Sequence, residues 1–318
     1  MTSLDTVLDS GIDPFTENGA RSTQINRICV VHLARATNGT GPLRAFLDSY
    51  RAHPAGVAHE LLIVFKGFRQ PLEPAYEELL IDVSHARRFV DDRGLDVDVY
   101  FDTARAIQAD AFCFLNSFSV ILSDRWLSKL SHALTLDGIG LVGASGTWQS
   151  HSYGYLPPEW IAAAIARRAP WKRLALRLFP WLKPLRNLPK TWRWRGFDPF
   201  PNYHVRTNAF MLRAEIGRRI RLTPTRNKFD AWMFESGKTG LTRQVLGMAR
   251  RATIVDAQGR VYEMADWYAS NTFWRAQQEG LLIADNQSRA YDQADLEGRR
   301  LYSTYAWGPM ADPGTSVP

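Results

Sequence analysis

Cysteine is scarce in this sequence, which has only Cys29 and Cys113 among its 318 residues. Both fall within predicted strands, where a cysteine is usually a small buried side chain, and two such residues build neither a zinc site nor a disulfide framework. None of the seven histidines has a second ligand at metal-binding spacing. No apolar run approaches the ~20 residues that cross a bilayer. The sequence therefore predicts a protein of a reducing compartment with no spanning segment.

Acidic residues are outnumbered in the chain. Its 32 Asp and Glu face 39 Lys and Arg, which gives a formal net charge of +7 and a pI near 9.5. This excess favours an anionic partner such as a nucleotide phosphate, a nucleic acid or an anionic membrane surface. The first 24 residues differ, because they carry Asp5, Asp9, Asp13 and Glu17 and no apolar core. They indicate a flexible leader rather than a signal peptide.

Strand and helix patterns alternate from residue 25 through residue 143. Continuous apolar runs predict strands over 28–33, 60–65, 111–115 and 139–143, which is typical of strands covered on both faces. Helices are expected from Pro42, over 73–80 and 84–91, before 111 and from Ser123-Asp124, with further strands at 82–83 and near 97–101. The alternation predicts an α/β fold with a mixed, mostly parallel sheet flanked by helices.

Residues 157–200 form a basic, tryptophan-rich insert. Ten basic residues face only Glu159 and Asp198, and five tryptophans accompany them. Segments of this kind lie in membrane interfaces, so we expect contact with an anionic membrane surface or with an acceptor. A lid over an active site is the second interpretation. Single-stranded nucleic acid also suits basic residues interleaved with aromatics, but no nucleic-acid fold signature accompanies them, and no nucleic-acid partner is expected.

Globular patterns return after the insert. Strands are expected over 209–212 and 253–256, with a return strand at 261–262. Helices are expected over 214–220, across most of 231–249 and in the tryptophan-rich stretch 264–284.

The order of all these segments resembles that of family 2 glycosyltransferases with the GT-A fold. The resemblance covers roughly residues 25–260 and rests on ICVVHLARATNGTGPLRAFLDSY, HELLIVFKG, TARAIQADAFCFLNSFSVILSDRWLSKL, GIGLVGASG, NAFMLRAEI and FDAWMFESGKTGLTRQVLGMARRATIVD. It implies a GT-A-like, Rossmann-like sheet. It also implies sugar transfer from a nucleotide-sugar to a glycan or lipid-linked acceptor, in bacterial polysaccharide or glycoconjugate assembly. The place implied is the cytoplasm or the inner face of its membrane.

On this basis the chain divides into a leader (1–24), a nucleotide-sugar-binding half (25–156), the basic insert (157–200), an acceptor-side half (201–262) and a C-terminal helical extension (263–318). Two other functions stay open. One is a catalytically silent GT-A-like module that binds a glycan or a protein, and the other is a nucleotidyltransferase with a related sheet.

The sequence departs from the family pattern at two strand ends. The strand-end motif is usually Asp-x-Asp, whereas residues 116–119 read Asn-Ser-Phe-Ser, and the second strand ends at Lys66 instead of at an Asp. Because Mg²⁺ and Mn²⁺ prefer carboxylate oxygens, metal use stays open. Either the metal is absent and basic residues such as Lys66, Arg35, Arg105 and Arg206 neutralise the diphosphate, or the nucleotide binds in another pose.

The resemblance places the nucleotide-sugar at the ends of the predicted strands 28–33, 60–65 and 111–115. Turn and helix-capping roles stay open for these polar residues, since Asn38-Gly39 is itself a turn signal. The residues expected at the nucleotide-sugar site are Ala34, Arg35, Thr37, Asn38, Lys66, Arg105, Asn116, Ser117 and Ser119.

Sugar transfer also requires a base for the acceptor hydroxyl. The resemblance assigns that role to Glu235, just ahead of a predicted helix, and a single base favours an inverting reaction. Asp230 is the alternative. A helix-start carboxylate and a helix cap are the structural interpretations of these two residues. The residues expected at the acceptor site are Thr147, Trp148, His151, Arg206, Asn208 and Arg243, for which core, surface and solvated roles remain open.

Overall fold

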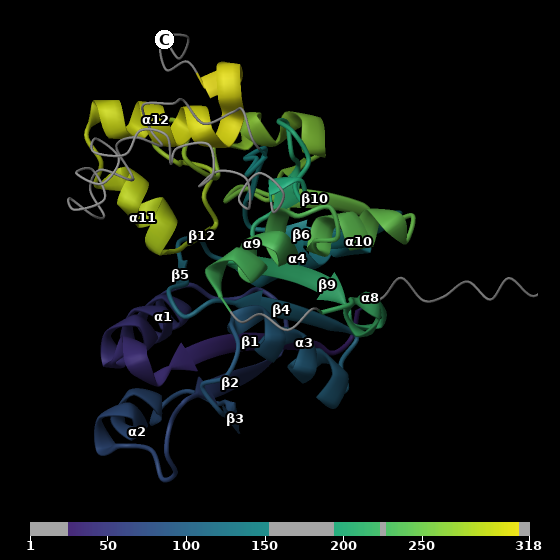
Figure 1. The fold of residues 1–318 in the computed structure, drawn as a ribbon. Coiled ribbons are helices and arrows are strands. Elements are labelled where there is room, and N and C mark those ends of the chain that lie inside the picture. Colours follow the sequence, from purple (N-terminus) through teal and green to yellow (C-terminus); the bar gives the residue numbers. More distant parts are fainter. Residues whose placement is uncertain (1–24, 153–193, 223–226, 312–318) are drawn as a thin grey trace, which may run out of the picture.

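A computed structural model describes residues 25–152, 194–222 and 227–311 of the chain (Figure 1). Across the sheet, the strands lie in the order β11 (Val261–Tyr262), β10 (Arg251–Val255), β6 (Ile139–Gly143), β9 (Ala209–Arg213), β4 (Ala111–Leu115), β1 (Ile28–Arg35), β2 (Glu60–Lys66) and β3 (Ala86–Val90). Strands β9 and β11 are antiparallel to their neighbours, and the other strands run parallel to one another. The predicted mixed, mostly parallel sheet is confirmed.

Helices cover both faces of this sheet. Helices α1 (Thr40–Ala52), α2 (Pro74–Leu80) and α4 (Trp126–Thr135) pack on one face, and α3 (Asp96–Ala106), α8 (Ala214–Arg219), α10 (Leu241–Gly247) and α12 (Leu296–Trp307) pack on the other. Successive strand residues alternate between the two cores, as the period of two requires. In β4, for example, Cys113 belongs to the first core and Phe112 and Phe114 to the second. Double coverage explains the continuous apolar runs in the sequence.

Two short strand pairs complete the described fold. Strand β7 (Gly146–Thr147) pairs with β8 (His204–Val205), and β5 (Val120–Ile121) pairs with β12 (Ile283–Ala284). The remaining helices are η1 (Ala36–Asn38), α9 (Lys228–Ser236), η2 (Met264–Ser270), α11 (Asn286–Asp292) and η3 (Gly308–Ala311). Figure 1 shows α11 and α12 together at the end of the molecule that β5 and β12 join to the main sheet.

The predictions for residues 82–101 are wrong. The expected helix at 84–91 is the edge strand β3, and the expected strand near 97–101 is the first part of α3. In β3, Arg87 and Arg88 interrupt the apolar pattern, because an edge strand is only partly covered. In α3 the buried side chains include valines and aromatics, which are residue types that favour strands and so predict one here. The Asp98 carboxylate accepts a hydrogen bond from Leu95 N at 3.0 Å and thereby supports the start of the helix.

The prediction of a helical stretch over 264–284 is wrong beyond Ser270. The 3₁₀ helix η2 ends there, and Asn271, Trp274, Ala276 and Gln278 all have positive φ angles between 46° and 52°. Left-handed residues stop a right-handed helix, so the chain continues irregularly into β12. The helix expected from Ser123-Asp124 begins later, at Trp126, with Arg125 as its N-cap residue, so Ser119 does not cap it.

Both cysteines are buried and unpaired, as predicted. They lie on neighbouring strands and face opposite cores, and burial raises the pKa of Cys29 to about 12. Among the described helices none is long and apolar enough to span a bilayer. Of the insert, only residues 194–200 belong to the described chain, where Phe197 is buried and bridges to Gly237. The leader and residues 157–193 lie outside the described residues.

A buried imidazole in β1 makes stability depend on pH. The ring of His32 stacks on Phe46 with centroids 3.7 Å apart, and neither ring nitrogen has a hydrogen-bond partner among the described residues. Burial lowers the pKa of His32 to about 3. The unfolded chain therefore binds a proton below about pH 6.5 that the folded chain does not, so stability falls as the pH falls through the range from 6.5 to 3.

We predict that His32→Leu removes this term. Leucine has a similar volume and no unpartnered nitrogen, so the wild-type protein should lose about 2 kcal/mol more stability than the variant between pH 7.5 and pH 5. Urea unfolding at both pH values measures this, and the difference at pH 7.5 reports the change in packing alone. Equal losses in the two proteins would show that His32 does not titrate on unfolding.

Candidate functional site

A cavity of about 230 Å³ lies at the edge of the sheet where the parallel strands end. Arg35 is the last residue of β1, and Asn116 directly follows β4. Both line the cavity, because β1 and β4 are parallel neighbours whose carboxyl ends meet at the same edge. In open α/β sheets, ligands bind outside this edge.

The antiparallel strand β9 brings a second set of residues to the same edge. Ala209, at its amino end, pairs with Leu115 at the carboxyl end of β4. The residues just before β9, Arg206 to Asn208, therefore lie beside Asn116, whose backbone N donates to the Asn208 carbonyl at 2.9 Å. The Asn116 side chain closes its own turn, since its Oδ1 accepts from Phe118 N at 2.9 Å and from Ser119 Oγ at 3.1 Å.

Glu235 also lines the cavity, from α9. The sequence predicts Glu235 just ahead of a helix, whereas it lies in the last turn of α9. A role as a helix-start carboxylate therefore does not apply. Its Oε1 accepts from Thr207 N at 2.7 Å and from Thr207 Oγ1 at 3.1 Å. Its Oε2 has no hydrogen-bond partner within the described chain. The carboxylate is thus oriented with one oxygen available.

Asp230 has a structural role at the other end of α9. Asn227 is the N-cap residue, and the Asp230 carboxylate accepts from Asn227 N at 3.2 Å in a capping box. Asp230 does not line the cavity. Of the two expected bases, only Glu235 is therefore placed to reach a bound molecule.

Arg206 and Asp285 form a buried ion pair at the cavity wall. Their atoms Nη2 and Oδ2 are 2.7 Å apart, and the side chains are only 5% and 2% exposed. The Arg206 guanidinium also lies 3.8 Å from the centre of the Phe273 ring. The other carboxylate oxygen of Asp285 caps α11, where it accepts from Ser288 N at 2.8 Å. The pair connects the loop before β9 to the C-terminal helices.

Asp96, at the start of α3, adds a further carboxylate to the cavity. Burial raises its pKa, against the opposing effect of Lys66 and Arg35. Lys66 is buried and donates to the Gly94 carbonyl at 2.7 Å, and Arg35 pairs with Asp92 at 2.9 Å. These two cations therefore hold the loop that presents Asp96, and Lys66 does not line the cavity.

Two cavity residues carry buried donors without an acceptor. The Tyr100 hydroxyl and the Asn208 Nδ2 have no hydrogen-bond partner among the residues the structure describes. Buried donors without a partner are rare and destabilising, so they often mark a place where a ligand supplies the acceptor. Together with Arg35 and Arg206 they make this wall rich in donors.

The structure brings five of the expected site residues to the cavity: Arg35, Asn116, Arg206, Asn208 and Glu235. Arg105 is remote, because it lies at the opposite end of α3 and donates to the Ile220 carbonyl at 3.0 Å. Thr37 is exposed on η1. The expected nucleotide-site residues that do not line the cavity are Ala34, Thr37, Asn38, Lys66, Arg105, Ser117 and Ser119.

The other expected acceptor residues also lie outside this cavity. Trp148 is a core residue that contacts Trp307 and donates from Nε1 to the Met264 carbonyl at 3.0 Å. The hydroxyl of the buried Thr147 donates to the Ala306 carbonyl at 3.2 Å. His151 stacks on Trp232, and burial lowers its pKa to about 4. Arg243 pairs with Asp198 at 2.8 Å.

Sequence reasoning missed Asp96, Tyr100, Thr207 and Asp285. The wrong strand at 97–101 concealed Asp96 and Tyr100. Asp285 did have a signal, because Asp285-Asn286-Gln287-Ser288 reads as an N-cap sequence. No local pattern indicates that a residue at 285 pairs with one at 206.

The cavity does not offer the ligands of a protein-held divalent cation. No group of three or more His, Cys, Asp or Glu side chains in the described ranges is placed to hold a metal. At the end of β4 the described residues line the cavity with the amide Asn116 and with no carboxylate, and the Asp285 carboxylate is already bound to Arg206. These residues do not fit a metal site.

We predict that Asp285→Asn destabilises the fold by about 3 kcal/mol, because it leaves the Arg206 charge buried without its partner. Asparagine is an equally good N-cap, so the change isolates the ion pair. Urea unfolding measures the loss.

Asp295→Asn is the matched control, because the exposed Asp295 caps α12 by accepting from Gly298 N at 2.7 Å and has no buried arginine beside it. It should cost less than about 0.5 kcal/mol. A loss below about 1 kcal/mol for Asp285→Asn would contradict a strong buried pair.

No protein-family model matches the sequence, and no curated protein matches it. Solved structures with a similar fold include glucosyl-3-phosphoglycerate synthase from Mycobacterium tuberculosis with Mn²⁺, UDP and phosphoglyceric acid, at 16% identity and TM-score 0.37, covering 65% of this chain and 63% of that one. The mannosyltransferase PcManGT from Pyrobaculum calidifontis with GDP-Man and Mn²⁺ has 13% identity and TM-score 0.42, over 79% and 61%.

A third structure is 4-diphosphocytidyl-2C-methyl-D-erythritol synthase from Anaerococcus prevotii, at 12% identity and TM-score 0.40, covering 72% of this chain and 87% of that one. The chain spans less than two thirds of the length of the first two. Since all three are so distant, the function is inferred from the cavity of this chain.

Proposed function

We propose that the protein is a glycosyltransferase that binds a nucleotide-sugar in the cavity between β1, β4 and α9. The observation that carries this proposal is the Glu235 carboxylate, which Thr207 fixes by one oxygen while the other has no partner in the described chain. The same cavity is lined by Arg35, Arg206 and two residues with buried donors that have no acceptor in the described chain, Tyr100 and Asn208. Group transfer from a phosphorylated donor requires a positioned donor and a base for the acceptor hydroxyl, and this cavity offers side chains for both.

In the proposed reaction Glu235 accepts the proton of an acceptor hydroxyl. The acceptor oxygen forms a bond to the anomeric carbon as the bond from that carbon to the diphosphate oxygen breaks. A single displacement of this kind inverts the anomeric configuration. Arg35 and Arg206 stabilise the charge that develops on the departing diphosphate. No step is assigned to a metal ion.

Charge balance limits how this cavity can hold a diphosphate. Its lining carries Arg206 and Arg35, which also pairs with Asp92, against Asp96, Glu235 and Asp285. Asp285 is neutralised by Arg206, and the raised pKa of Asp96 allows this carboxyl to take up a proton when an anion approaches. The cavity therefore suits one diphosphate at most, with its charge shared among several donors.

The acceptor class and cellular place remain part of the proposal. We infer a glycan or lipid-linked acceptor and a role in polysaccharide or glycoconjugate assembly from the family resemblance. We infer attachment to the inner face of the cytoplasmic membrane from the basic, tryptophan-rich composition of 157–200. Residues 157–193 lie outside the described chain.

We predict that one nucleotide among UDP, GDP, CDP and dTDP, or its sugar conjugate, binds in the presence of EDTA, because arginine and neutral donors take the place of a metal. Calorimetric titration in EDTA and then in Mn²⁺ measures this. Binding that appears only with Mn²⁺ would show that the chain has metal ligands that the cavity lacks. No binding in either buffer would favour the silent binding module.

We predict that Glu235→Gln lowers turnover by about 10²- to 10⁴-fold with the nucleotide-sugar found in that screen, because the base is lost. Release of the nucleoside diphosphate measures turnover. The nucleotide affinity should be unchanged, since glutamine keeps the hydrogen bonds from Thr207.

Asp230→Asn tests the alternative base. Asp230 caps the start of α9 and does not line the cavity, so it is not expected to act in the reaction. This variant should keep its turnover within about threefold. Full activity in Glu235→Gln would contradict the assignment of the base.

A further inference from the structure

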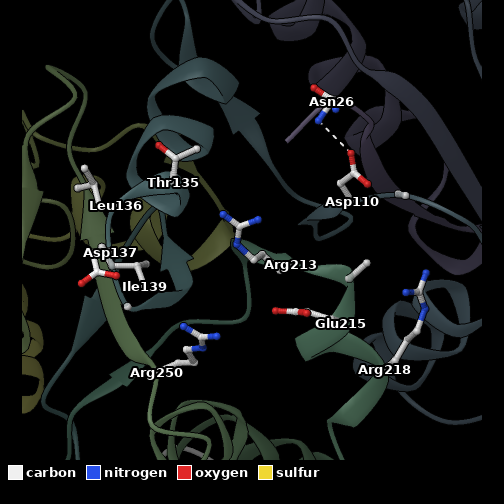
Figure 2. A pocket seen from close by; sticks show the side chains of 13 residues that line it. Asn26, Asp110, Thr135, Leu136, Asp137, Ile139, Arg213, Glu215, Arg218 and Arg250 are labelled. Atoms are coloured by element: carbon white, nitrogen blue, oxygen red, sulfur yellow. Dashed lines mark hydrogen bonds between the residues drawn. The ribbon is translucent and has the colours of Figure 1, made fainter. Parts of the chain in front are cut away.

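A second cavity, of about 410 Å³, lies at the other edge of the sheet, where the parallel strands begin (Figure 2). Asn26 precedes β1, Asp110 precedes β4 and Ile139 begins β6. Strand β4 has five residues, so the two cavities are separated by roughly 16 Å of extended chain. The second cavity therefore shares no residue with the candidate active site.

Three arginines from different elements surround this cavity. Arg213 ends β9, Arg218 lies on α8 and Arg250 precedes β10. Figure 2 shows the Arg213 guanidinium reaching into the middle of the hollow, with Arg250 directed toward it from below. Among the described residues, neither Arg218 nor Arg250 forms an ion pair. Guanidinium groups provide forked donors that match phosphate and carboxylate oxygens.

The position of Arg250 is set by its backbone and by a glycine. Ala249, just before it, has φ of 55°, which turns the chain out of α10. The Arg250 side-chain stem then packs on Gly140 of β6, where an added Cβ would lie 2.7 Å from the Arg250 Cβ. The absence of a side chain at 140 thus lets the arginine approach the sheet edge.

Carboxylates complete the lining. Asp110 has a structural role, since its Oδ2 accepts from Asn26 N and Arg27 N, both at 2.9 Å. Asp137 and Glu215 are exposed at the wall, and Figure 2 shows Glu215 pointing into the hollow. Carboxylates accept hydrogen bonds from hydroxyl groups. The lining therefore provides donors for an oxyanion and acceptors for the hydroxyl groups around it.

We propose that this second cavity binds a sugar-sized molecule that carries an oxyanion, either a phosphate or a carboxylate. The volume is within the range of small-molecule sites and exceeds what a bare anion fills. Arg213, Arg218 and Arg250 bind the oxyanion, and Asp137 and Glu215 accept from its hydroxyl groups. The site is distinct from the cavity of the proposed function and does not depend on it.

The test is calorimetric titration of the full chain with glucose 1-phosphate, glucuronate, glucose and inorganic phosphate. We expect glucose 1-phosphate or glucuronate to bind more tightly than both glucose and inorganic phosphate, and the stronger of the two identifies the oxyanion. In Arg218→Gln/Arg250→Gln this binding should weaken at least tenfold. Both arginines are exposed, so the variant should unfold at the wild-type temperature.

Arg219→Gln is the matched control, because Arg219 is an exposed arginine on the same helix that does not line the cavity. It should bind as the wild type does. The proposal fails if no compound binds, if glucose binds as well as the charged sugars, or if inorganic phosphate alone binds as tightly. Binding that the double variant retains would belong to another site and would equally overturn it.

Discussion

The antiparallel pairing of β9 with β4 and β6 is the constraint on which both cavities depend. Because β9 runs against its neighbours, its amino end lies where they end, and its carboxyl end lies where they begin. Arg206, Thr207 and Asn208 thus join Arg35 and Asn116 at one edge, while Arg213 reaches the other. An all-parallel sheet would place these residues on the opposite edges and would leave Glu235 without the Thr207 bonds that orient it.

The buried pair of Arg206 and Asp285 extends this arrangement to the C-terminal helices. A desolvated ion pair contributes little net stability, but either charge left alone is costly, so the two elements are tied in one geometry. The same carboxylate caps α11. The position of the cavity arginine Arg206 is therefore coupled to the folding of a segment 79 residues further along the chain.

The sequence predicted the central strands well, because strands covered on both faces appear as short continuous apolar runs, as Ala111–Leu115 illustrates. It failed where burial is partial or where aromatics and valines occur in a helix, as in β3 and α3. For the site, strand ends were predictable, so Arg35 and Asn116 were found. Asp285 was not found, because its partner Arg206 is distant in sequence. Lys66 was wrongly expected at the site, because the loop that covers it lies after β3 and is not apparent from the strand itself.

The described residues on either side of 153–193 lie close together in the fold. Strands β7 and β8 pair directly, with Thr147 opposite His204, and the rings of His151 and Trp194 are 6.1 Å apart. The chain thus departs after Ser152 and returns at Trp194 at nearly the same point. The entropic cost of bringing two points of a chain together grows only slowly with the number of residues between them. Relatives of this chain could therefore exchange the intervening segment for a shorter or longer one while the sheet and both cavities stay as they are.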